Sequence, residues 1–505
     1  MRDALPARTV LAVALLCVAL AALMLVQTRN LFLDDTFIHL RIASNLATHD
    51  VYSFNGDVPA YSTSSPLYTA LLAMLWKLMP MVWLPKIVGI AAYASLLILV
   101  GVAFFRSRGS AQTAIYLTWV IAITSPMAIR WLTDGMETAL VATTSVVLGS
   151  LVAALRLQSG FSHPWLRCSL GLVAAIATLL RVEFAYLAAL ATCAFVTDAL
   201  WQRSPLSGRV RLGLLSLVGG SLLSLMAVQA YFGYVLPDTA LAKAVASTAG
   251  GTVLDSVKAH LAASLFGVGT LIAWSISFWH ASRAPGQRVF VAALNAGLPL
   301  LLVLIATRHQ DVQGYRYFVF IEFFLLAVNS ALVAPAQEIS MMRNQSRWRS
   351  MALLGLTMML VAWESYDWRR LEMLSAGRSA SFEKFLLGDL SYLRGKRGLA
   401  WDVGMIGYFS QSTILDSNGL VNGRGMARLP AAERLRQLTA TPVDFVFAND
   451  DQLKQLRGLL ETSDWHLRAQ YQFPNFSGNP DTHYLLVRDP TVAADPTRAT
   501  SNPRP

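Results

Sequence analysis

The sequence predicts an α-helical, polytopic membrane protein with about 11 transmembrane helices and a small C-terminal α/β domain on the outer face. Three observations lead to this. The 505 residues are 55% hydrophobic and only 14% charged. Apolar runs long enough to span a hydrocarbon core of about 30 Å recur along most of the chain. After about residue 365, short strand-like runs alternate with helical stretches. We therefore expect a membrane module over 1–365, an outer domain over 366–490 and a disordered tail over 491–505.

The apolar runs of the membrane module follow one another with short polar connections between them. Each is long enough, or nearly so, to cross the membrane as a helix. A further stretch, 67–79, is short, contains Lys77 and stops at Pro80, so the sequence leaves open whether it crosses. The apolar runs lie at 9–26, 84–105, 112–131, 138–155, 184–201, 212–232, 259–279, 289–307 and 317–334.

The net charge of +11 arises largely in the connections that we assign to the cytoplasm. An excess of Lys and Arg on that side is the usual signature of membrane topology, so we expect no nucleic-acid partner. The first outer loop, 27–66, and the C-terminal domain then lie outside. In a bacterium this describes a multi-pass protein of the inner membrane, with its active site and C-terminal domain on the periplasmic side. The basic connections are 1–8, 106–111, 156–167, 201–211, 281–288 and 336–349.

Ionisable residues gather at the outer ends of the apolar runs. Charge this close to a bilayer is costly, and it usually serves a function or is paired. Both signs occur along this face, so converging helix ends would form one polar pocket at the membrane surface. The residues are Asp34, Asp35, His39 and Arg41, then Asp134 and Glu137, Arg181 and Glu183, Asp238 and Lys243, and Asp311 and Arg316.

Each of these residues also has a structural interpretation, which the sequence leaves open. Asp34 and Asp35 precede an amphipathic stretch, TFIHLRIASNLA, and carboxylates stabilise the N-terminus of a helix. Arg181 and Glu183 are spaced to form an ion pair at a helix junction. Arg316 resembles an interfacial anchor, and a histidine such as His39 is more often hydrogen-bonded within the protein than bound to a ligand.

The mixture of charges also fits the transfer of a sugar from a lipid phosphate. A carboxylate must take the proton of the acceptor hydroxyl as that oxygen attacks the anomeric carbon, and Asp34 or Asp35 would supply it. Cations must hold the departing phosphate, and Lys243, Arg181 and Arg316 are the candidates. Direct displacement inverts the anomeric centre. The remaining candidates, which would bind substrate, are His39, Arg41, Asp134, Glu137, Glu183, Asp238 and Asp311.

An ordered series of motifs between about 31 and 420 resembles the GT-C glycosyltransferases, integral membrane enzymes that use polyprenyl-phosphate sugars. Within that group the series most resembles the arabinofuranosyltransferases related to the mycobacterial terminal β-(1→2) enzyme. Two departures are HQDVQG, with Asp311, where relatives often carry a Gly-rich acidic segment, and a short C-terminal region. The motifs are LDDTFIHLRIASNLATHDVYSFNGD, YSTSSPLYTALLA, DGMETAL, LLRVEF, YFGYVLPDTALAK, GYRYF and AWDVGMIGYFSQSTILDSNGL.

The resemblance implies a GT-C-like bundle with its site in the first outer loop and one aspartate of the Asp34–Asp35 pair as the catalytic base. It implies a polyprenyl-phosphate-linked donor, a glycan or lipid acceptor of the cell envelope, and arabinofuranose or another pentose as the sugar. By motif, the other site residues would be Asp134, Glu137, Arg181, Glu183, Lys243 and Arg316.

The sequence favours no cofactor, although Asp34, Asp35 and Asp134 could coordinate a divalent metal. Two other functions remain open. An O-antigen ligase or polymerase would perform related chemistry on a pyrophosphate-linked donor, which needs more cations than this chain offers. A transporter or flippase of a lipid-linked substrate would favour repeated halves and charge near the midplane. This sequence shows no repeat, and its charge lies at one face.

Overall fold

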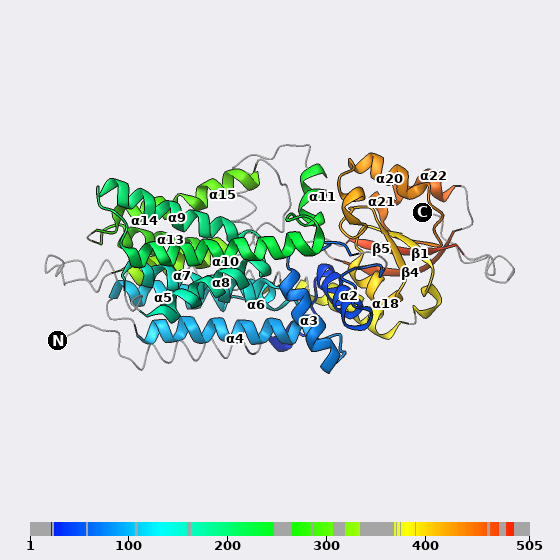
Figure 1. The fold of residues 1–505 in the computed structure, drawn as a ribbon. Helices are drawn as coiled ribbons and strands as arrows, with labels where there is room; N and C mark the ends of the chain where they lie inside the picture. The colour runs from blue at the N-terminus through cyan, green and yellow to red at the C-terminus, as the bar shows by residue number, and fades with distance from the viewer. Residues whose placement is uncertain are drawn as a thin grey trace, which may run out of the picture.

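The protein consists of a long helical bundle and a small sheet domain at one end of it, with helices α2 and α3 between the two (Figure 1). This arrangement comes from a computed structural model. It describes residues 22–488 except for 23–24, 57–58, 107–109, 159–162, 247–264, 285, 307–318, 334–367, 370, 374, 389, 462–464 and 474–480.

The described helices of the bundle follow the predicted apolar runs, except for α8, which lies between runs 138–155 and 184–201 and was not predicted as one. Four of them, α4, α7, α9 and α10, are long and apolar enough to cross a membrane. The total of about 11 crossings stays a prediction, because run 9–26 and others lie wholly or partly outside the described residues. The bounds are α4 (Leu84–Phe105), α5 (Ser110–Ile123), α6 (Pro126–Thr133), α7 (Thr138–Arg156), α8 (Pro164–Leu180), α9 (Phe184–Trp201), α10 (Gly208–Phe232), α13 (Leu265–Ala281), α14 (Arg288–Asn295), α15 (Gly297–Ala306) and α16 (Val319–Leu332).

Two predicted runs are each divided into two helices. Run 112–131 breaks between α5 and α6, where the Ser125 hydroxyl accepts a hydrogen bond of 3.3 Å from the Ala128 N–H and Pro126 opens α6. Proline at the first helical position fits this break, since its missing N–H needs no partner there. Run 289–307 breaks between α14 and α15 at Ala296.

Close packing inside the bundle depends on small residues. A Cβ added to Gly149 of α7 would lie 2.6 Å from the Phe324 carbonyl oxygen of α16. A Cβ on Gly220 of α10 would overlap the backbone of Gly171 in α8. Small residues at such crossings are typical of membrane bundles, because they let helix backbones approach closely.

Helices α2 (Asp34–His49) and α3 (Pro66–Leu78) occupy the junction between bundle and outer domain (Figure 1). Helix α3 has 13 residues, or about 20 Å at 1.5 Å per residue, which is too short to cross the hydrocarbon core alone. It packs against α2 through Tyr68, Leu72 and their neighbours. Helix α11 (Asp238–Ala246) stands beside the outer domain and contacts its helix α19.

The outer domain is a five-stranded mixed sheet with strand order β2-β1-β3-β5-β4. The strand predictions at 398–402, 412–417, 443–449 and 483–489 are confirmed as β1, β2, β3 and β5, whereas β4 was not predicted. The strands are β1 (Arg397–Ala400), β2 (Thr413–Asp416), β3 (Phe445–Asn449), β4 (His466–Gln472) and β5 (Thr482–Val487). The helices are η3 (Ser391–Leu393), α18 (Gly404–Ser410), α19 (Gly423–Ala427), α20 (Ala431–Thr439), α21 (Asp450–Gln455), α22 (Arg457–Leu460) and residues 375–387.

Strand β1 lies between β2 and β3 and is parallel to both. Helix α18, which connects β1 to β2, packs on the face that carries Ala400 and Phe447. Helix α20 precedes β3 and packs on the opposite face, against Leu399 and Val446. The order in which the strands are added to the sheet therefore reverses at β1: β2 is added on one side of it and β3 on the other. In open α/β sheets, the carboxyl ends of the strands on either side of such a reversal commonly form a ligand site.

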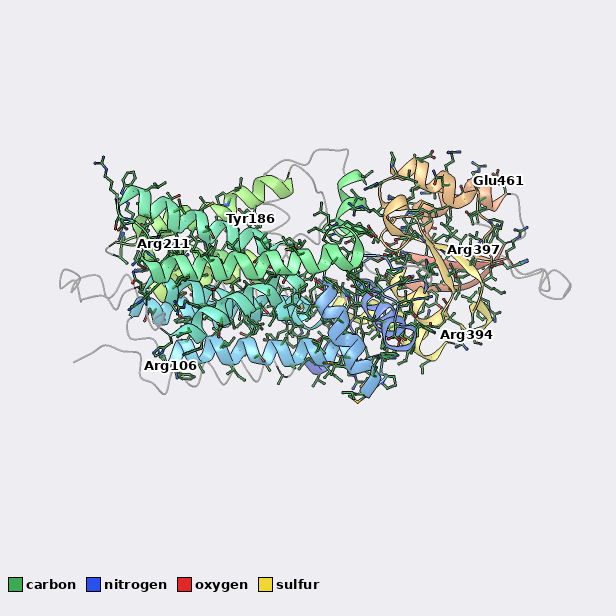
Figure 2. All side chains as sticks on the ribbon, in the orientation of Figure 1. Arg106, Tyr186, Arg211, Arg394, Arg397 and Glu461 are labelled. Atoms are coloured by element: carbon green, nitrogen blue, oxygen red, sulfur yellow. The ribbon has the colours of Figure 1, made fainter. Side chains whose placement is uncertain are left out.

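Four arginines labelled in Figure 2 mark the two ends of the molecule. Arg106 and Arg211 lie at the end of the bundle away from the sheet domain, whereas Arg394 and Arg397 lie on the sheet domain itself (Figure 2). Both Arg106 and Arg211 belong to connections that the sequence assigns to the cytoplasm. Their position agrees with the predicted sidedness.

Candidate active site at the junction of the two domains

Asp34 joins the membrane module to the outer domain. Its Oδ2 accepts a hydrogen bond of 2.7 Å from the Gly404 N–H, and its Oδ1 accepts one of 2.8 Å from the Met405 N–H. The sequence suggested that the aspartates cap the helix that follows them. Both do lie in the first turn of α2, but Leu33 is its N-cap residue and no side chain caps that helix. Asp34 instead satisfies N–H groups that open α18 of the outer domain.

Gly404 makes this close contact sterically feasible. A Cβ at that position would overlap the Asp34 carbonyl oxygen and lie 2.9 Å from Oδ2. Burial and, next, the nearby charge of Asp402 raise the pKa of Asp34, the N–H bonds from Met405 and Gly404 oppose the shift, and the net result is a pKa of about 7 in place of 3.8. Asp34 therefore changes its charge near neutral pH.

A second carboxylate stands beside Asp34 in the turn after β1. The Asp402 Oδ2 lies 2.6 Å from Nε2 of His483, a residue of β5. The His483 side chain is 2% exposed and stacks on Phe447, but the Asp402 side chain remains 46% exposed. Burial alone would lower the pKa of His483, yet the hydrogen bond and charge of Asp402 raise it above its usual value. The pair thus holds an accessible carboxylate in a fixed orientation.

Arg378 brings a positive charge to these carboxylates. It lies in the helix over 375–387, and burial lowers the pKa of its guanidinium. The negative charges of four aspartates oppose that shift, in decreasing order Asp402, Asp34, Asp134 and Asp35. The guanidinium is therefore close to carboxylates from α2, from the turn between α6 and α7, and from the outer domain.

The turn between α6 and α7 is locked against the start of α2. The Asp134 carbonyl accepts hydrogen bonds from the Thr36 hydroxyl at 3.2 Å and the Leu33 N–H at 3.4 Å. Gly135 has a φ of +96°, and a Cβ there would lie 2.6 Å from Cγ2 of Thr36. The Asp-Gly pair is needed for this approach, and it brings Asp134 to the Asp34–Asp35 pair as the sequence predicts.

The predicted residues His39, Glu137, Arg181 and Glu183 form one ion network. Arg181 lies between two carboxylates, with NH1 3.3 Å from Oε1 of Glu137 and NH2 2.6 Å from Oε1 of Glu183. The other Glu137 oxygen lies 3.7 Å from Nε2 of His39, whose Nδ1 is 2.8 Å from the Thr69 hydroxyl. Residues from α2 and from two helix junctions therefore converge, as the sequence predicts.

The Arg41 guanidinium contacts protein backbone. It donates to the carbonyls of Phe54 at 2.6 Å, of Ser412 at 2.8 Å, and of Gly407. The side chain is 5% exposed. These bonds fasten α2 to the first outer loop and to the outer domain. A structural role explains its placement, and the predicted contact with substrate stays untested.

Asp238 opens α11 at the edge of the outer domain. Its Oδ2 accepts a hydrogen bond of 3.0 Å from the Tyr234 hydroxyl, and its Oδ1 lies 3.8 Å from NH1 of Arg424 in α19. Burial raises the pKa of Asp238 to about 6. Lys243 belongs to the same helix, but its side chain is not described. Asp311 and Arg316 lie outside the described residues.

Arg378, Asp402 and His483 are the site residues that sequence reasoning missed. Asp402 falls within a motif already singled out, AWDVGMIGYF, so that motif was the available signal. No sequence signal marks Arg378 or His483, since each is a single polar residue in an ordinary helix or strand. Among the described side chains, no group of three His, Cys, Asp or Glu residues could hold a metal ion.

Comparison with known structures supports this two-part architecture. The structure is similar to a crystal structure of ArnT from Cupriavidus metallidurans bound to undecaprenyl phosphate, with a TM-score of 0.55 and 13% identity, over 95% of this chain and 99% of that chain. The apo form of the same protein gives a TM-score of 0.54 and 13% identity over 95% and 98%. The predicted helical membrane fold with a small C-terminal sheet domain is thus confirmed.

Sequence comparisons add little about function. Residues 386–493, within the outer domain, match a family described as a domain of unknown function (DUF8728). No curated protein sequence matches the chain. The finer resemblance to arabinofuranosyltransferases stays a prediction.

Proposed function

We propose that this protein is a membrane glycosyltransferase that moves a sugar from a polyprenyl-phosphate donor to a glycan or lipid acceptor, with Asp35 as the general base. One observation carries the assignment of the base. Both carboxylate oxygens of Asp34 are bonded to N–H groups of α18, so that residue is committed to holding the two domains together. We therefore assign the role of base to Asp35, its neighbour in the same helical turn.

The proposed reaction is a single displacement. As the acceptor hydroxyl attacks the anomeric carbon, its proton passes to the Asp35 carboxylate and a new C–O bond forms. The bond from that carbon to the phosphate oxygen breaks, and the polyprenyl phosphate leaves with the electron pair. Attack opposite the leaving group inverts the anomeric centre.

The distribution of charge within the site favours binding of the two substrates on different sides of it. The side formed by Asp34, Asp35, Asp134 and Asp402 is acidic, with Arg378 among them, and would repel a phosphate. The side that would receive the phosphate is expected to carry Arg181, Lys243 and Arg316. A neutral, hydroxyl-rich acceptor fits the acidic side, and the anionic donor fits the basic one.

The bound lipid of the similar ArnT structure supports undecaprenyl phosphate, or a related polyprenyl phosphate, as the carrier of the donor sugar. Arabinofuranose or another pentose is proposed from the motif resemblance alone. The basic connections support an orientation with the site and outer domain on the periplasmic side of a bacterial inner membrane. We propose no metal requirement, because the displacement of a lipid monophosphate needs only the base and the cations named above.

Transfer from radiolabelled polyprenyl-phosphate sugars by the purified protein tests the proposal. Wild type should transfer sugar from one donor in the panel, and Asp35→Asn should lower the rate by about 10² to 10⁴ while thermal unfolding is unchanged. Transfer by Asp35→Asn at the wild-type rate would exclude Asp35 as the base. Folded wild type that transfers from no monophosphate donor would favour a pyrophosphate-dependent ligase, or a flippase if lipid-linked sugar crosses the bilayer of proteoliposomes intact.

A further inference from the structure

One turn of the outer domain, residues 401–403 between β1 and α18, lies at the proposed reaction centre. This turn lies at the carboxyl end of β1, the strand at which the strand order of the sheet reverses. Met405 and Gly404, which follow it, are bonded to Asp34. The position of the turn relative to the base is therefore set by hydrogen bonds.

The geometry points to Asp402, oriented by His483 and flanked by Arg378, as the subsite that binds hydroxyl groups of a sugar acceptor and directs one of them at Asp35. This inference rests on the proposed function and deepens it. It assigns acceptor recognition to the outer domain and leaves donor recognition to the membrane module.

Asp402 is far more accessible than two other carboxylates of the junction, Glu137 and Asp134. Glu137 and Asp134 are each 2% exposed, whereas the Asp402 side chain is 46% exposed. Its Oδ2 lies against His483, which is buried, stacked on Phe447 and in edge contact with Phe473. A carboxylate fixed at one oxygen and open to solvent can accept a hydrogen bond from a ligand with little loss of conformational entropy.

Arg378 supplies the complementary donor. The charges of Asp402 and, next, of Asp34 act most strongly on its guanidinium, so Arg378 is near both the outer-domain turn and the start of α2. A sugar hydroxyl both donates and accepts. A carboxylate beside a guanidinium therefore offers both kinds of partner to neighbouring hydroxyls of one ring.

The side from which the acceptor attacks indicates that these residues bind the acceptor. In a displacement with inversion, the acceptor approaches the anomeric carbon from the side opposite the phosphate. The base lies on the acceptor side, because it takes the proton of the attacking hydroxyl. Asp402 lies two residues before Gly404, whose N–H is bonded to Asp34, and Asp35 adjoins Asp34, so Asp402 is held on the side on which the base lies.

The test compares Asp402→Asn with Asp444→Asn, a matched change in the same domain. Asp444 Oδ2 accepts the Arg397 N–H at 2.8 Å at the amino end of β1, away from the junction. With the donor that wild type uses, two rates are measured: transfer to a panel of octyl glycosides and hydrolysis by water without acceptor. Thermal unfolding is followed for every variant.

Asp402→Asn should raise the KM for the octyl glycoside by about tenfold or more, because a hydrogen bond to a charged group is lost. The KM for the donor should stay within about twofold of wild type, and donor hydrolysis should fall much less than transfer, because water needs no such subsite. Asp444→Asn should change neither rate. Should Asp402→Asn not fold, Asp402→Glu keeps the charge, displaces the carboxylate and should give the same selective rise in KM.

An unchanged KM for the octyl glycoside in Asp402→Asn would overturn the inference. So would equal losses of transfer and hydrolysis, since a structural role would impair both. Donor hydrolysis by wild type without transfer to any octyl glycoside would show that the site does not recognise sugar hydroxyls. The proposed function fails separately, when wild type neither transfers nor hydrolyses or when Asp35→Asn retains both rates.

Discussion

The Asp34 carboxylate and the Gly404 N–H are 370 positions apart in sequence and share a hydrogen bond of 2.7 Å. One belongs to the first outer loop of the membrane module, and the other opens a helix of the outer domain. Because Asp35 adjoins Asp34 and Asp402 lies two residues before Gly404, this bond brings the proposed base and the proposed acceptor subsite together. Docking of the outer domain should therefore be a condition for activity.

Gly404→Ala tests this dependence on docking. The new methyl group would overlap the Asp34 carbonyl oxygen, so α18 or α2 must shift. We expect a loss of about 1–3 kcal/mol in unfolding free energy and a large loss of transfer, measured by thermal unfolding in detergent and by the radiolabel assay. Gly458→Ala is the control, since a Cβ there meets no atom within 4 Å. Equal behaviour of the two variants would contradict the tight junction.

Protonation of Asp34 should make stability depend on pH. Its folded-state pKa of about 7 exceeds the usual 3.8, so the folded protein binds the proton more tightly. The contribution of this group to unfolding free energy therefore falls as pH rises from about 4 to about 7. The difference between wild type and Asp34→Asn in thermal unfolding, measured across that range, isolates this effect. A difference that does not vary with pH would show that Asp34 is already ionised in the folded state at low pH.

Features set by local composition could be predicted from the sequence. Helix α9 has the bounds of the apolar run 184–201, because a predominantly apolar run of that length leaves little choice of structure. The strand over 443–449 was found because its apolar residues form a short run between turn signals. Strand β4 was missed: its alternation of Leu467, Ala469 and Tyr471 is present, but this exposed strand carries polar residues between them.

Features that depend on docking could not be predicted. Asp34 was expected to stabilise its own helix, and only the position of α18 shows that it caps another. Arg378 lies more than 340 positions from Asp35, so no local pattern connects them. The convergence of Glu137 with Arg181 could be anticipated from topology, because both lie at outer helix ends.

The Glu137–Arg181 pair should contribute more to stability than the Arg181–Glu183 pair, although its distance is longer. Glu137 is 2% exposed and Glu183 is 32% exposed, so solvent screens the second pair more. We expect Glu137→Gln to cost about 3 kcal/mol and Glu183→Gln about 1 kcal/mol or less. Thermal unfolding of both variants, with Arg181→Met added for a double-mutant cycle, gives the comparison. A larger loss in Glu183→Gln would reverse the order argued from burial.

Arg378 should control the pH dependence of transfer. Its positive charge favours the ionised carboxylates around it, so Arg378→Gln removes an influence that keeps the base deprotonated. The acid limb of the plot of kcat/KM against pH should then move to higher pH, and much of the lost rate should return as pH is raised. Arg378→Lys keeps the charge and should shift the limb far less. A rate that falls equally at every pH in both variants would mean that Arg378 acts through guanidinium geometry alone, because a purely geometric contact has no reason to follow the ionisation of its neighbours.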